Sequence, residues 1–235
     1  APRRQALGLS TVIRAACFDL DGTLGGYGGD FGGLMAMART ELGLEQCDMN
    51  RFAAIVQEEL RRDGPLDLAT ALERTLHRLE QRVPPDLPDV AARITARYAA
   101  EERPAPGAAR LLERLDASGV KLGLITNGPV DMQRAALDAL GFAPRFRVVI
   151  VSGDRDVAAR KPSPRVFRLA CAGLETRPDE TLMVGDDPTG DVRGALDFGM
   201  QAVLIGPDRE GKALGVPAVG GIEPLDVLLR ARYGL

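Results

Sequence analysis

The sequence contains one histidine, three cysteines and no apolar run of the roughly 18 residues that a membrane-spanning helix needs. His77 falls in an amphipathic helical pattern, which favours a solvated residue on a helix face over a catalytic one. The cysteines, Cys17, Cys47 and Cys171, are far apart and form no Cys-x-x-Cys pair. This spacing argues against a zinc site and is typical of a reducing compartment. Because the basic residues near the N-terminus are also not followed by an apolar stretch long enough for a signal peptide, we expect a cytoplasmic location. A Ser-His-Asp or Cys-His hydrolase is disfavoured, since it would depend on His77 alone.

Charge and glycine content disfavour further classes of partner. The net charge of -3 argues against nucleic acid or an anionic membrane as the main partner. Six glycines lie within residues 25–33, but they do not fit the Gly-x-Gly-x-x-Gly pattern of dinucleotide-binding proteins. Because glycine destabilises helix and strand interiors, we expect this run to be a flexible connector.

Two kinds of periodicity divide the chain. From residue 34 to about 102, apolar residues recur every three or four positions, which predicts about four helices. After residue 105, strand-like apolar runs alternate with helical patterns. The expected strands are residues 12–18, 121–125, 146–151, 181–184 and 201–205, and the expected helices between and after them are about 111–118, 130–140, 164–172, 192–198 and 224–232. This alternation predicts a parallel sheet with helices on both faces.

The predicted fold class is therefore α/β, with a Rossmann-like core and an inserted all-α domain. We place the core at residues 1–25 and 105–235 and the helical domain at residues 26–104. Both junctions are rich in glycine or proline, so we expect the helical domain to move as a lid over the strand ends.

Polar residues follow several of the predicted strands. Taken singly, each stretch is equally consistent with ordinary turn or helix-cap chemistry. The residues concerned are Asp19, Asp21, Thr126, Asn127, Lys161, Asp186, Asp187 and Asp191. In a parallel sheet the carboxyl ends of the strands share one edge, so we expect these side chains to surround one crevice.

Such a group of carboxylates needs positive charge. Two like charges 4 Å apart repel by about 4 kcal/mol at an effective dielectric constant near 20. Oxygen ligands select a hard cation, and Mg²⁺ is the usual choice where phosphate is also bound. Lys161 supplies a second positive charge, and Thr126 with the following backbone N–H groups can hold an anion. The pattern indicates phosphoryl-transfer chemistry.

These stretches resemble the four motifs of the haloacid dehalogenase (HAD) superfamily, in its Mg²⁺-dependent phosphatase branch with a helical C1-type cap. The resemblance covers residues 12–206. The motifs stand in the family's order: Asp19-Leu20-Asp21-Gly22-Thr23, Thr126-Asn127-Gly128, Lys161-Pro162, and Gly185-Asp186-Asp187 with Asp191.

The resemblance implies a role for each motif residue. Asp19 would be the nucleophile that forms an aspartyl-phosphate, and Asp21 the general acid and base. Substrate binding would fall to Thr126, Asn127 and Lys161. The resemblance assigns Mg²⁺ to Asp19, the backbone carbonyl of Asp21, and Asp186, with Asp187 and Asp191 in support. The expected activity is hydrolysis of a small phosphomonoester.

Other functions remain open. A phosphotransferase of the β-phosphoglucomutase type shares this layout, and a binding or regulatory module could use the same fold. Dehalogenation is disfavoured by Asp21, and phosphonate hydrolysis by the lack of lysine in residues 26–102. A P-loop-like stretch at residues 206–212 is followed by Ala213 instead of serine or threonine. We expect that stretch to be a surface loop.

Overall fold

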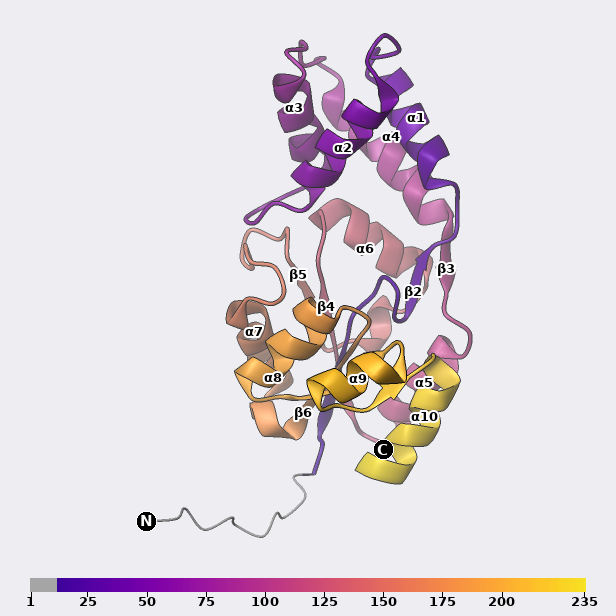
Figure 1. Cartoon of the computed structure of the whole chain (residues 1–235), viewed down its shortest axis with the longest axis vertical. Helices are drawn as coiled ribbons and strands as arrows, with labels where there is room; N and C mark the ends of the chain where they lie inside the picture. Colours follow the sequence, from indigo (N-terminus) through magenta and orange to yellow (C-terminus); the bar gives the residue numbers. More distant parts are fainter. Residues whose placement is uncertain (1–11) are drawn as a thin grey trace.

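The computed structural model describes residues 12–235, so the first eleven residues of the predicted core lie outside the described part. Its centre is a six-stranded sheet in the order β5-β4-β1-β6-β7-β8, in which each neighbouring pair is parallel (Figure 1). The strands are β1 Ala15–Phe18, β4 Lys121–Thr126, β5 Val148–Val151, β6 Thr181–Gly185, β7 Gln201–Ile205 and β8 Ala218–Val219. The predicted α/β fold class is confirmed, and β8 is a strand that the sequence pattern did not predict.

Helices cover both faces of the sheet. Along β1, Ala16 and Phe18 belong to one hydrophobic cluster and Ala15 and Cys17 to another, as the alternation of side chains in a strand requires. The first cluster includes residues of α5 and α10, and the second residues of α7 and α8. The helices of this half are α5 Ala108–Ala117, α6 Val130–Ala139, α7 Pro164–Leu174, α8 Gly194–Phe198, α9 Asp208–Leu214 and α10 Ile222–Leu228.

The segment between β1 and β4 forms the predicted helices at the end of the molecule beyond α6 (Figure 1). They are α1 Phe31–Glu41, α2 Met49–Leu60, α3 Leu68–Arg78 and α4 Leu87–Ala100, and we call them the helical insert. Aspartates cap two of them, because Asp48 accepts from the backbone N–H of Arg51 and Asp67 from that of Thr70. The apolar stripes that predicted these helices form the interior of the insert.

The prediction of a flexible glycine connector was wrong. Gly25–Tyr27 forms strand β2, which pairs antiparallel with β3, Glu102–Pro104, and Gly32 and Gly33 lie in the first turn of α1. Strand pairing uses backbone groups, which glycine retains. At Gly25 a Cβ would lie 2.9 Å from the backbone oxygen of Arg103, so a small residue suits this close approach. The two chain crossings into and out of the insert therefore form a hydrogen-bonded ribbon.

A second contact joins the insert to the sheet half. The backbone N–H of Leu66 donates to Gly153 O, and Val130 N–H donates to Leu66 O, both at 2.9 Å. The carboxylate of Asp131, in the first turn of α6, accepts from the N–H of Leu68 at 3.0 and 3.2 Å. An aspartate of the core thus helps to cap the first turn of α3 in the insert.

The region after β7 differs from prediction. Residues 206–212 were expected to form a surface loop, but Asp208–Leu214 is a short helix that ends where Gly215 adopts a φ of +74°. The sequence pattern did not predict this helix, because its one buried position is Gly211 and it therefore has no apolar stripe. No helix within residues 12–235 combines the length and the apolar character that crossing a membrane requires.

Candidate active site

Asp19 extends β1 by one residue, because its backbone N–H donates to Val184 O of β6 at 2.9 Å. In the sheet, β1 lies between β4 and β6. Thr126 is the last residue of β4, and Asp186 follows directly after β6. The three strand ends that were singled out in the sequence therefore meet at one edge of the sheet, at its centre.

Lys161 connects two of the site's carboxylates. Its Nζ lies 2.5 Å from Asp19 Oδ1 and 2.6 Å from Asp191 Oδ1, and it donates to Ile125 O at 2.8 Å. Burial alone would lower the pKa of Lys161, but the charges of Asp19 and Asp191 raise it above its ordinary value. Two hydrogen bonds, to Asp19 and Ile125 O, and the ion pair with Asp191 therefore hold Lys161 as a fixed positive charge beside Asp19.

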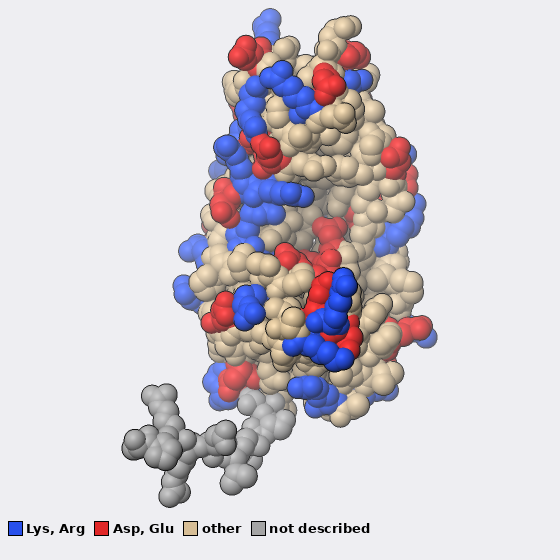
Figure 2. All heavy atoms as spheres, viewed as in Figure 1, with Lys and Arg blue, Asp and Glu red and all other residues tan. Residues whose placement is uncertain are grey.

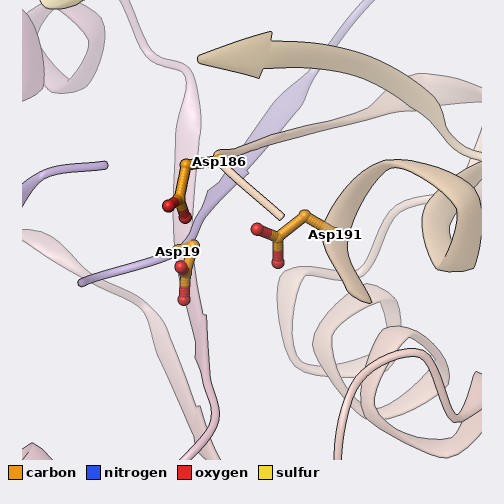
Figure 3. Close-up of side chains that lie close together, drawn as sticks. All are labelled: Asp19, Asp186 and Asp191. Carbon is orange, nitrogen blue, oxygen red and sulfur yellow. The ribbon is translucent and has the colours of Figure 1, made fainter. Parts of the chain in front are cut away.

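Three carboxylates form an oxygen-rich cluster. Asp19, Asp186 and Asp191 each bring a carboxylate oxygen within 4.8 Å of the others, with Asp191 reaching in from the side opposite the other two (Figure 3). Burial and the charge of Asp19 raise the pKa of Asp186 to about 6. Burial also raises the pKa of Asp191, although Lys161 opposes the shift. One lysine thus leaves negative charge uncompensated, and a donor set made of oxygen suits a hard divalent cation.

Two glycines make room for these acids. A Cβ at Gly22 would overlap the carboxylate of Asp186, and a Cβ at Gly185 would overlap that of Asp191. Gly22 also has a φ of +81°, in the left-handed region that glycine enters without strain. The glycines beside the acidic residues therefore set how closely the carboxylates approach one another.

Asn127 and Asp187 make contacts within the loops that carry the site. The side chain of Asn127 accepts from Lys161 N–H at 2.9 Å and donates to Lys161 O at 3.2 Å, so it orients the loop that presents Lys161. Asp187 accepts from Thr189 N–H at 2.9 Å and caps the helical turn Pro188–Arg193. Its own N–H donates to Asp191 Oδ2 at 3.0 Å.

Asp21 contacts two residues that the sequence analysis did not single out. Gln133 Nε2 donates to Asp21 Oδ2 at 3.1 Å, and the Tyr98 hydroxyl donates to Asp21 Oδ1 at 3.3 Å. Burial raises the pKa of Asp21; both hydrogen bonds oppose this shift, while the charge of Asp19 adds to it. Gln133 also accepts from the Thr126 hydroxyl at 2.6 Å.

The sequence held a signal for Gln133. Gln133 lies on the buried side of α6, three positions before Ala136 and four before Leu137. A polar residue in an apolar stripe needs a hydrogen-bond partner. Tyr98 gave no such signal, because an aromatic residue in an amphipathic helix is ordinary core composition.

The hydrogen bond between Tyr98 and Asp21 places the strand ends beside the helical insert. Figure 2 shows a hollow between the insert and the sheet half, with acidic side chains on its lower border and basic side chains along one side. A small anionic molecule could enter there, and the acidic floor would need a cation to accept it.

A comparison with protein families identifies the chain. The family model of haloacid dehalogenase-like hydrolases matches residues 13–199, a range that includes all the predicted site residues. The chain belongs to the HAD-like hydrolases. The family assignment of this HAD-like chain confirms the resemblance drawn from its motifs.

Individual relatives support the family. A ribulose-1,5-bisphosphate 5-phosphatase of Halopiger xanaduensis is 32% identical over 215 residues, which cover 86% of this chain and 88% of that protein. A phosphoserine phosphatase of Thermus thermophilus is 42% identical over 100 residues, but the match spans only 39% of its length. A HAD phosphatase of Thermococcus onnurineus has a similar structure, with a TM-score of 0.69, 26% identity, and coverage of 94% of this chain and 98% of that one.

Proposed function

We propose that this HAD-like hydrolase is a Mg²⁺-dependent phosphatase that cleaves a small phosphomonoester through an aspartyl-phosphate on Asp19. The observation that carries the proposal is the position of Asp19, which contacts the buried Lys161 and shares an oxygen cluster with the carboxylates of Asp186 and Asp191. The reaction class is hydrolysis of small phosphate esters, in agreement with two relatives that are named as phosphatases.

In the first step, a carboxylate oxygen of Asp19 attacks the phosphorus atom and forms an O–P bond. The bond between phosphorus and the ester oxygen breaks, and Asp21 gives its proton to that oxygen as the alcohol leaves. The raised pKa of Asp21 favours the protonated form that this step needs. Lys161 stabilises the negative charge on the phosphoryl oxygens. Thr126 was also predicted to bind the substrate, but its one hydroxyl proton is donated to Gln133.

In the second step, water attacks the phosphorus of the aspartyl-phosphate. Asp21, now a carboxylate, takes a proton from this water, the Asp19–phosphorus bond breaks, and inorganic phosphate leaves. Asp191 holds Lys161 in place through both steps by its 2.6 Å ion pair. Asn127 fixes the same lysine from its backbone side.

The carboxylates of Asp19, Asp186 and Asp191 and the backbone carbonyl of Asp21 are the groups that would hold Mg²⁺. When bound, the cation offsets charge between the carboxylates and the phosphoryl group and polarises the phosphoryl oxygens. The raised pKa of Asp186 supports this assignment, since burial and the charge of Asp19 both disfavour its carboxylate form and an added positive charge would stabilise it. In this scheme Asp187 acts only by capping the loop that carries Asp191.

The helical insert serves as a cap in this proposal, and the division at residues 26–104 agrees with the β2–β3 ribbon at its base. The cap would keep bulk water from the aspartyl-phosphate and contact the part of the substrate beyond the phosphate. The substrate is a small phosphorylated metabolite. A cytoplasmic location stays a prediction from the spacing of the cysteines.

The test is hydrolysis of 4-nitrophenyl phosphate with Mg²⁺ and with EDTA. We expect Mg²⁺-dependent turnover in the wild type and a loss of at least about a thousandfold in Asp19→Asn, because the nucleophile is removed. The surface substitution Asp179→Asn is the matched control and should retain full activity. Turnover in Asp19→Asn at the wild-type rate would refute the nucleophile assignment.

Product analysis separates the alternatives. Quenched reactions with labelled substrate should give inorganic phosphate and a protein-bound label that hydroxylamine releases. Label returned to a sugar phosphate in place of inorganic phosphate would instead identify a phosphotransferase of the β-phosphoglucomutase type. Binding of Mg²⁺ and phosphate without label on the protein would favour a binding module.

A further inference from the structure

Both carboxylate oxygens of Asp21 already carry a hydrogen bond from a side chain outside the four motifs. Gln133 donates to Oδ2 from helix α6 of the sheet half, and Tyr98 donates to Oδ1 from the last turn of helix α4 in the insert. The two donors approach from different halves of the chain. Together they leave Asp21 little freedom to rotate about its side-chain bonds.

The orientation of Gln133 is fixed by chemistry. A carboxylate only accepts hydrogen bonds, so the amide nitrogen must face Asp21 and the amide oxygen must face the Thr126 hydroxyl. Gln133 is 95% buried, since 5% of its surface is exposed. A Cβ at Gly128 would lie 2.8 Å from Gln133 Nε2, so the glycine of the Thr-Asn-Gly motif leaves the space that this amide fills.

Tyr98 is fixed as firmly. Its ring stacks on that of Tyr27 in β2, with the centroids 5.2 Å apart and the planes at 10°. Burial, followed by the charges of Asp21 and Glu102, raises the pKa of Tyr98, so its hydroxyl keeps the proton that it donates. The stack depends on the ring alone, which means that the hydroxyl can be removed without removing the packing.

We propose that Gln133 and Tyr98 are positioning residues that aim the carboxyl group of Asp21 at the leaving oxygen of the substrate. This inference rests on the proposed function. Neither residue touches the phosphoryl group in the scheme above, and each acts through Asp21. Loss of either hydrogen bond lets Asp21 turn away, and proton transfer to the leaving group becomes less efficient.

Such a role predicts a dependence on the leaving group. A phenolate of low pKa leaves without help, while an alkoxide needs its proton from Asp21. We therefore expect kcat/KM, which reports the step up to formation of the aspartyl-phosphate, to fall most for alkyl phosphates. The loss in Tyr98→Phe and in Gln133→Met should be about ten- to a hundredfold for an alkyl phosphate and about threefold or less for 4-nitrophenyl phosphate, as a fraction of the usual effect of an acid catalyst.

The experiment measures kcat/KM for a series of substituted aryl phosphates and one alkyl phosphate with both variants. Tyr27→Phe is the matched control, because the Tyr27 hydroxyl contacts Asp30 O, at 3.5 Å, and not Asp21. Thermal unfolding confirms that each variant folds. A steeper dependence on leaving-group pKa in Tyr98→Phe and Gln133→Met, with an unchanged slope in Tyr27→Phe, supports the proposal.

Two outcomes would overturn it. An equal loss across all leaving groups would show a general structural effect, and wild-type kcat/KM for every substrate would show that Asp21 needs neither contact. A wild type that hydrolyses no member of the series would refute the proposed function itself. An inactive wild type can be told apart from the two outcomes that overturn the positioning role, because both of those require a wild type that hydrolyses the substrates.

Discussion

The side-chain amide of Asn127 is hydrogen-bonded twice to the backbone of Lys161, with its oxygen 2.9 Å from Lys161 N and its nitrogen 3.2 Å from Lys161 O. The amide therefore joins the end of β4 to the loop before α7. It places Lys161 so that Nζ reaches Asp19. Asn127, which the sequence analysis predicted to bind the substrate, thus holds the loop that carries Lys161.

Replacing Asn127 by alanine should misplace Lys161. We expect kcat to fall by about ten- to a hundredfold, and the free energy of unfolding to fall by about 1–3 kcal/mol, because two partly buried hydrogen bonds are lost. Steady-state kinetics and urea unfolding measure the two effects. Asn50 is the only other asparagine and is exposed on α2, so Asn50→Ala is the matched control. Unchanged kinetics in Asn127→Ala would contradict the positioning role.

Gly22→Ala should weaken Mg²⁺ binding in addition to lowering the stability of the fold through backbone strain. Gly22 has a φ of +81° and Gly119 a φ of +79°, so alanine should cost each position about 1–2 kcal/mol of stability. Only at Gly22 would the new Cβ collide with a carboxylate, that of Asp186, whereas nothing lies within 4 Å at Gly119. Calorimetric titration with Mg²⁺ should therefore show weakened binding in Gly22→Ala and wild-type binding in Gly119→Ala. Equal affinities in the two variants would show that the glycine serves the turn alone.

Glu102 should make the protein less stable as the pH rises. It is buried, with 6% of its surface exposed, and neither carboxylate oxygen has a hydrogen-bond partner among the described residues. Burial, with a contribution from Asp21, raises its pKa to about 7, although the charge of Arg103 opposes the shift. The folded state therefore binds the proton more tightly than the unfolded state, whose pKa is about 4.3. The stability contributed by the protonated group is present below pH 4 and is lost as the pH rises to about 7.

Glu102→Gln removes this titration. We expect the variant to gain stability relative to the wild type between pH 5 and pH 8, with the largest difference above pH 7. Urea unfolding at a series of pH values measures the difference. Glu101→Gln is the control, because Glu101 forms salt bridges with Arg97 and Arg103. A difference that stays constant with pH would mean that Glu102 titrates at an ordinary pKa.

Asp186→Asn should have opposite effects with and without Mg²⁺. Without the cation, burial and Asp19 raise the pKa of Asp186 to about 6, so its charge destabilises the fold near pH 7.5 and the neutral amide should be more stable. With Mg²⁺ at a hundred times its dissociation constant, the wild type should gain about 2.7 kcal/mol, and most of this gain should be lost in the variant. Thermal unfolding with Mg²⁺ and with EDTA tests the crossover.

Asp187→Asn is the comparison for this prediction. Its side chain caps the turn Pro188–Arg193, so the substitution should change stability by about 1 kcal/mol or less and leave the gain from Mg²⁺ intact. A variant that lost the Mg²⁺ effect would instead assign Asp187 to the cation site.

Strand ends were the part of the site that the sequence could predict. An apolar run that stops at Asp19 or at Asp186 indicates a buried strand and also shows where that strand ends. Residues that are adjacent in the chain carry both signals. The helical insert was predictable for the same reason, through its apolar repeat. The roles of Gln133 and Tyr98 were not, since each depends on a contact with Asp21 across more than 70 positions. The pairing of Gly25–Tyr27 with Glu102–Pro104 is likewise a long-range contact between backbones, which side-chain patterns do not encode.

The β2–β3 ribbon closes the helical insert at its base. Because the entry and exit of the insert are hydrogen-bonded neighbours, Tyr27 opposite Glu102, the 74 residues between them close on themselves at the base. A different helical domain with equally close ends could replace them without moving β1 or β4. The four motif stretches all lie outside these 74 residues. A chimaera would therefore keep Asp19, Lys161 and the acidic cluster, while the helical residues around the substrate would change.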